Sequence, residues 1–107
     1  MDQKTQARFE VRTKIIKAMA HPTRLFIVEQ LSRSSRCVQE LTRMVGADMS
    51  TVSKHLAVLK NAGLVQDERR GSAQVFYKLR CPCILAFFEC VESVIRSTAR
   101  QQLDLVK

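Results

Sequence analysis

Residues 49–63 read MSTVSKHLAVLKNAG, and their pattern predicts a helix with two contrasting faces. Val52, Leu56 and Leu59 recur at helical spacing and form one apolar stripe, while hydroxyl and lysine side chains occupy the opposite side. We therefore expect an amphipathic helix over about residues 49–62, which buries one face and leaves a row of hydrogen-bond donors free.

The segment before this helix predicts its partner in a helix-turn-helix. Residues 38–45 carry apolar side chains at helical spacing and end at Gly46, a favourable C-cap. Asp48 or Ser50 can then cap the helix that follows. Two helices joined by so short a turn form a helix-turn-helix, which places its second helix in the major groove of DNA.

The regions on either side predict a small wing and further helices. Two extended segments around a Gly-Ser pair predict a hairpin over about residues 64–79. Pro22 separates two helical patterns near the N-terminus, and Pro82 opens a long apolar-rich helix over about residues 82–105. The expected fold is mainly α with a two-stranded β-wing, in one winged-helix domain over residues 1–107.

The charge of the chain is concentrated in one part of it. The sequence has 107 residues, with 18 basic and 10 acidic side chains and a net charge of +8. Residues 1–80 hold 15 basic and 7 acidic side chains, whereas residues 81–107 hold three of each. A uniform solubilising surface would not segregate in this way, so we expect the basic part to bind a polyanion and the neutral end to contact protein.

The size and the motifs argue against an enzyme. So short a chain leaves little room for a deep substrate cleft, and it has no glycine-rich phosphate loop and no cluster of histidines and carboxylates. The apolar stretch at Ile84–Phe88 is too short to span a bilayer, and residues 1–12 do not resemble a signal peptide. We expect no membrane contact and a cytoplasmic location, where thiols stay reduced.

The predicted helix at residues 49–62 has the chemistry of a DNA-reading helix. Short hydroxyl donors on its first turns suit base edges, and cationic groups suit phosphates. The arginines at the tip of the hairpin, together with Lys78, suit the DNA backbone or minor groove. The candidate DNA-binding residues are Ser50, Thr51, Ser53, Lys54, His55, Arg69 and Arg70.

Several motifs occur in order over about residues 10–80. They are AHPTRL at 20–25, CVQEL at 37–41, MSTVSKHL at 49–56, LKNAGLV at 59–65 and RGS at 70–72, followed by VFY at 75–77. Together they resemble the ArsR/SmtB (arsenic-repressor) family of winged-helix transcriptional repressors. The resemblance implies a homodimer, joined through its first and last helices, that binds a palindromic double-stranded DNA operator and leaves it when an inducer binds. The neutral, apolar last helix agrees, because so small a chain needs a partner surface to cover it.

Both histidines fall within these motifs. His21 precedes Pro22, where we expect a structural residue at a helix start. His55 is either a packed residue or a phosphate contact. The last predicted helix contains no histidine, so the carboxylate and histidine zinc site found between the last helices of many relatives has no ligands here.

The cysteines are the candidate inducer site. The arsenic-sensing pattern of the family has Cys-Val-Cys where this chain has Cys37-Val38-Gln39, so only the first thiol is present. The others, Cys81, Cys83 and Cys90, suggest a sensor at the last helix that binds As(III), Sb(III) or another thiophilic ion, with no permanently bound cofactor. Cys81 and Cys83 flank Pro82, and the start of a helix favours thiolate.

Geometry limits how these thiols could act together, and other interpretations stay open. Cys83 and Cys90 are seven residues apart, about 10.5 Å along an intact helix. A shared ion therefore requires the first turns to unwind or a thiol from a second chain. An alternative is a thiol-redox response to persulfide, polysulfide or peroxide that links Cys37 to a last-helix cysteine. Some of the cysteines could instead be plain core residues. The rival classes are a disulfide reductase, which would need turnover with a dithiol, and a nucleoid or RNA-binding protein without sequence preference.

Overall fold

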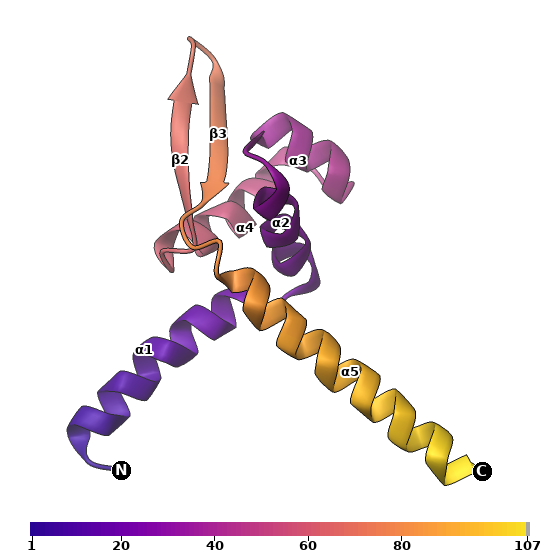
Figure 1. Cartoon of the computed structure of the whole chain (residues 1–107). Helices are drawn as coiled ribbons and strands as arrows, with labels where there is room; N and C mark the ends of the chain where they lie inside the picture. Colours follow the sequence, from indigo (N-terminus) through magenta and orange to yellow (C-terminus); the bar gives the residue numbers. More distant parts are fainter. Residues whose placement is uncertain (107) are drawn as a thin grey trace.

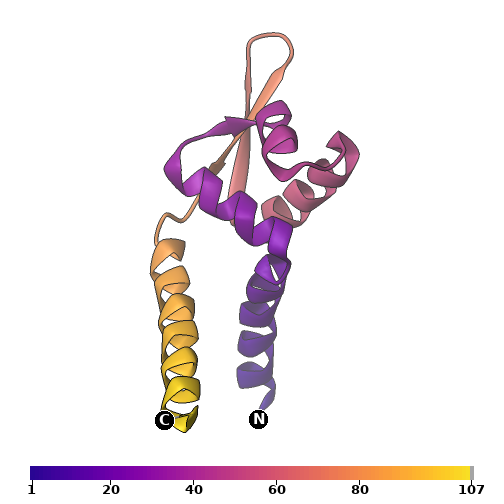
Figure 2. The ribbon, with the colours of Figure 1, turned by 90° about the vertical axis from the view of Figure 1, so that its right-hand side faces the viewer.

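The computed structural model describes residues 1–106. Its elements in chain order are α1 (Gln3–Met19), α2 (Pro22–Arg33), β1 (Arg36–Cys37), α3 (Val38–Val45), α4 (Met49–Asn61), β2 (Val65–Arg70), β3 (Gln74–Leu79) and α5 (Ile84–Val106). Helices α2, α3 and α4 and the sheet form a head, from which α1 and α5 extend as two long arms (Figure 1). Seen from the side, both arms run away from the head opposite to the hairpin (Figure 2).

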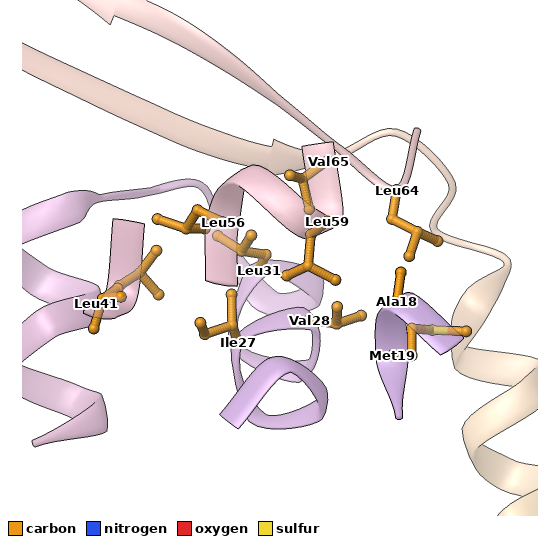
Figure 3. Packing of buried hydrophobic residues seen from close by; sticks show 11 residues of the cluster. Ala18, Met19, Ile27, Val28, Leu31, Leu41, Leu56, Leu59, Leu64 and Val65 are labelled. Atoms are coloured by element: carbon orange, nitrogen blue, oxygen red, sulfur yellow. The ribbon is translucent and has the colours of Figure 1, made fainter. Parts of the chain in front are cut away.

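The apolar stripes predicted from the sequence meet in the core of the head. Val52, Leu56 and Leu59 of α4 are completely buried, as are Ile27 and Val28 of α2. Leucines of α4 face the apolar side of α2, and the end of α1 closes the core beside Leu64 (Figure 3). This packing fixes which face of α4 remains outside.

The predicted helix-turn-helix is confirmed. Helix α3 ends at Gly46, whose φ of 77° lies in the left-handed region that glycine adopts without strain. Of the two predicted caps, Asp48 is the one that begins α4: its carboxylate accepts a hydrogen bond from the Thr51 backbone N–H at 2.7 Å. A short turn therefore sets the direction in which α4 leaves α3.

The predicted wing is present, and a third strand joins it. Strands β2 and β3 pair antiparallel, with Val65 opposite Leu79 and Arg70 opposite Gln74. The unpredicted strand β1 pairs with the other edge of β3, so the order is β1-β3-β2. Two residues are too few to show the alternation by which a strand is found in a sequence.

Helix α5 begins two residues later than predicted. We expected Pro82 at its first position, but Pro82 and Cys83 form a turn that precedes the helix at Ile84. The backbone N–H groups of Ile84, Leu85 and Ala86 donate to carbonyls three residues earlier, at 3.1–3.2 Å. This tight turn redirects the chain as it leaves β3. None of the helices within residues 1–106 is both long and apolar enough to cross a membrane.

Candidate nucleic-acid interface and thiol groups

The outer face of α4 carries a row of exposed polar side chains. Thr51, Ser53 and Lys54 are exposed, and the buried stripe on the opposite side holds them outward. Ser50 is exposed as well, but its hydroxyl donates to Asp48 at 2.8 Å. The Ser50 proton is thus committed to the helix cap, while its oxygen can still accept a hydrogen bond.

The cap also leaves a fixed negative charge at the start of α4. Hydrogen bonds from the Thr51 backbone and the Ser50 hydroxyl lower the pKa of Asp48 to about 2. Lys54 lies close enough to contribute to this shift. The interface therefore combines hydroxyl donors, one lysine and one carboxylate at the end of the helix that would enter a groove.

At the wing, the two predicted arginines have different surroundings. The Arg70 guanidinium lies 4.4 Å from the centre of the Phe76 ring and 3.8 Å from the Glu68 carboxylate. Arg69 is exposed, and no ion pair of Arg69 occurs within residues 1–106. Arg69 is thus the freer cation, whereas Arg70 of β2 is held over the Phe76 ring of the neighbouring strand β3.

His55 lies apart from the exposed row. Its ring is half-buried, with its centre 4.5 Å from that of His21, the residue that precedes α2. Burial, followed by the nearby charges of His21 and Arg24, lowers the pKa of His55 below its usual 6.5. His55 is therefore neutral at pH 7, and its position matches the packed alternative rather than a charged phosphate contact.

The structural role expected of His21 is confirmed. His21 caps α2, because its Nδ1 accepts a hydrogen bond from the Thr23 backbone N–H at 3.1 Å. Sequence reasoning missed its contact with His55, since no local pattern relates positions 34 residues apart. Only the packing of α4 on α2 brings the two rings together.

Cys37 is buried and occupies the N-cap position of α3. Its thiol donates to the Glu40 carboxylate at 3.2 Å, and its backbone N–H donates to the same oxygen at 3.4 Å. These contacts, the thiol first, lower the pKa of Glu40, and Arg36 lies 3.5 Å away on its other oxygen. The spacing of Cys37 and Glu40 is that of a capping box with cysteine in place of serine, a signal that could have been found in the sequence.

The other three cysteines are exposed. Cys81 and Cys83 lie in the link between β3 and α5, and Cys90 lies two turns into α5. The interpretation of cysteines as core residues therefore fits Cys37, which is buried in this chain, but not Cys90, which is exposed. In the part of the chain that the structure describes, no group of three histidine, cysteine or acidic residues could hold a metal ion. We expected Cys81 near the cap and Cys83 in the first turn of the last helix. Because α5 begins at Ile84, both cysteines lie outside it instead.

A helix-turn-helix followed by an antiparallel hairpin defines the winged helix-turn-helix class of proteins. Comparison with known proteins gives the family. The model of the bacterial regulatory protein, arsR family, matches residues 21–67. The HTH-type transcriptional regulator YgaV of Escherichia coli is 34% identical over 90 residues, which are 83% of this chain and 90% of YgaV. The chain belongs to the ArsR family of bacterial regulatory proteins.

Two other relatives bear on function. The HTH-type transcriptional repressor SmtB of Mycobacterium tuberculosis is 44% identical over 66 residues, which span 62% of this chain but only 48% of SmtB. The solution structure of the homodimeric winged helix-turn-helix DNA-binding domain of Mb0332 from Mycobacterium bovis is 25% identical and has a TM-score of 0.79. That likeness covers 94% of this chain and 93% of the Mb0332 domain.

Proposed function

We propose that this protein is a DNA-binding transcriptional repressor that acts as a homodimer. The observation that carries the proposal is the exposed row of Thr51, Ser53 and Lys54 on a helix whose other face is fully buried. Such a helix suits the major groove, and the wing, with Arg69 at its end, suits the adjacent backbone. The basic charge of residues 1–80 supplies the attraction to DNA.

DNA binding is tested with the region upstream of the gene and random DNA as competitor. A repressor prefers its upstream region, whereas equal competition by random DNA would indicate a nucleoid protein. Lys54→Ala should weaken binding and reduce the slope of log affinity against log salt by about one, as expected for one lost phosphate contact. Lys60→Ala is the matched control on the same helix, because Lys60 is paired with Asp67 at 3.0 Å. Equal losses in both variants would contradict this role of α4.

The inducer is proposed to act on the exposed thiols near α5. Cys81, Cys83 and Cys90 are accessible, and soft thiolates suit As(III), Sb(III) and other thiophilic ions. Two of these thiols lie in the link that connects the wing to α5. Ligation by three thiols, after unwinding of the first turn of α5 or with a thiol of the second chain, would change the position of the head relative to that helix and release a palindromic operator.

A second candidate is thiol-redox control, which would act through Cys37 at the N-cap of α3. A polysulfide that accepts two electrons could join Cys37 to a last-helix cysteine, directly or through sulfur atoms, with loss of both thiol protons. The Cys37 thiol donates to Glu40, so this bond would remove that hydrogen bond beside the N-cap of α3. Such a change would act on the first helix of the helix-turn-helix.

Single cysteine-to-serine variants separate the two candidates. Release of bound DNA is measured after addition of arsenite, antimonite, cadmium or polysulfide. Metalloid control predicts that loss of Cys81, Cys83 or Cys90 abolishes the arsenite response and that loss of Cys37 does not. Redox control predicts that Cys37→Ser abolishes the polysulfide response. A triple variant at Cys81, Cys83 and Cys90 that still releases DNA with arsenite would exclude the metalloid site.

A further inference from the structure

Met49 is the most exposed large apolar residue of the head. Its exposed fraction is 47%, against 37–40% for Leu25, Met44 and Val58. It belongs neither to the buried core nor to the partly buried apolar side chains that pack against this core. The first position of α4 therefore carries a large apolar side chain that the head leaves uncovered.

Met49 lies at the end of α4 that is distant from α1. The opposite end of α4 approaches α1, where Val58 and Asn61 line a pocket together with Ala18. Met49 precedes Asn61 by the whole length of α4, about 18 Å at about 1.5 Å per residue. A dimer joined through α1 and α5 would therefore leave Met49 uncovered, and another partner has to account for it.

The hydrogen-bond donors next to Met49 are used within the helix cap. The Ser50 hydroxyl and the Thr51 backbone N–H both donate to Oδ1 of Asp48, at 2.8 Å and 2.7 Å. Within residues 1–106 the second carboxylate oxygen, Oδ2, accepts no hydrogen bond. The pKa of Asp48, lowered to about 2 by these bonds, keeps the carboxylate charged at pH 7. The start of α4 thus presents an apolar side chain beside a free acceptor.

An apolar side chain beside an acceptor distinguishes between the base pairs of B-DNA. In the major groove an A·T pair presents the amino group of adenine, a donor, and the C5-methyl group of thymine. A G·C pair presents the cytosine amino group but no methyl group, and its guanine adds two acceptors that a carboxylate repels. The chemistry at the start of α4 therefore fits an A·T pair.

We infer that the start of α4 reads A·T base pairs, with the Met49 side chain against the C5-methyl group of thymine and Asp48 toward the adenine amino group. The inference rests on the proposed binding of DNA by α4, and it names the base that this helix selects. Helical side chains lean toward the N-terminus, so Met49 lies ahead of the exposed row that begins at Thr51. In a helix-turn-helix the N-terminal residues of the second helix are the ones that contact base edges.

Uracil in place of thymine tests the contact, because it removes the methyl group and keeps the base pair. The region upstream of the gene is amplified once with thymidine triphosphate and once with deoxyuridine triphosphate, so every thymine in the amplified strands is replaced without knowledge of the operator. A dimer that buries one thymine methyl group in each half-site should bind the thymine duplex about tenfold more tightly than the uracil duplex.

Variants of α4 assign this preference to one side chain. Met49→Ala should bind the thymine duplex about tenfold more weakly than the wild type and should bind the two duplexes within about twofold of each other. Val58→Ala is the matched control, because Val58 is an exposed apolar residue on the same helix but at the other end. It should keep the whole preference of the wild type. Far-ultraviolet circular dichroism checks that each variant is folded.

The possible outcomes separate the inference from the proposed function. Equal binding of both duplexes by a wild-type chain that still prefers its upstream region to random DNA would overturn the inference alone. A preference for thymine that persists in Met49→Ala would also overturn it, because DNA shape or another side chain would then sense the methyl group. Loss of the preference in Val58→Ala would do the same. A wild-type chain that binds its upstream thymine duplex no better than random DNA would contradict the proposed repressor, and the inference with it.

Discussion

The head and the two arms bury their apolar residues in opposite ways. In α4 every third or fourth residue, such as Leu56, is fully buried within the same chain. In α5, which has 23 residues, none is buried, and Val94 keeps 64% of its surface exposed. The head covers its own apolar side chains, whereas the apolar side chains of the arms need a partner surface to cover them.

Truncation of a core side chain should have the largest effect, a loss of stability in the head. Leu56→Ala removes a buried side chain where α4 packs on α2 and should reduce the free energy of unfolding by about 2–5 kcal/mol. Val94→Ala, at an exposed site of α5, should change it by less than about 1 kcal/mol in the monomer. Urea unfolding at a concentration below dimer formation measures both. Similar losses would mean that the arms pack within one chain after all.

A charge on the outer side of α5 should act on association rather than on the head. Val94→Asp puts a carboxylate among exposed apolar residues and should raise the dimer dissociation constant about tenfold or more. Ser93→Asp is the neighbouring control, because Ser93 accepts a hydrogen bond from Arg96 on the polar side of α5. Sedimentation measures the constant, and an equal response of the two variants would remove the distinction between the sides of α5.

Loss of the α4 cap should weaken the head by a smaller amount. Asp48→Ala removes the acceptor for the Thr51 backbone N–H and should lower the free energy of unfolding of the head. Asp2→Ala removes the equivalent bond at the start of the unpacked helix α1 and should not change the unfolding of the head. Thermal unfolding at pH 7 compares the two variants with the wild type, and equal shifts would contradict the separation of head and arm.

The pH dependence of the head should be the smallest effect. The pKa of His55 is lowered in the folded chain, so the unfolded chain binds this proton more tightly. The contribution of His55 to stability is complete above its usual pKa of 6.5 and declines as the pH falls below it. His55→Gln should therefore reduce the difference in Tm between pH 7.5 and pH 5.0. An unchanged difference would show that other groups carry the acid sensitivity.

Much of the head could be predicted from the sequence because its signals are local. Helix α4 has an apolar period, a cap at Asp48 and a stop near Gly63, and these signals agree with one another. The start of α5 was predicted less well. Pro82 is allowed at the first position of a helix, but it is equally compatible with the turn that connects β3 to α5.

Only those features of the candidate site that depend on local signals could be predicted. The exposed position of Thr51, Ser53 and Lys54 follows from the period of α4 alone. The burial of Cys37, the ring contact of His55 and the position of Arg70 over Phe76 depend on tertiary packing, which no local pattern encodes. Ion binding by the thiols and their response to oxidants stay predictions.

Strand β1 limits how far the wing can bend. Its two residues pair with Tyr77 and Phe76, so they clamp β3 at its middle and leave residues 69–75 projecting beyond this clamp. Cys37 is one half of that clamp, and its strand partner Phe76 is the ring on which Arg70 rests. A modification that pulled Cys37 off β3 would lengthen the unrestrained part of the hairpin and make its tip more mobile. No residue of the tip itself would have to change.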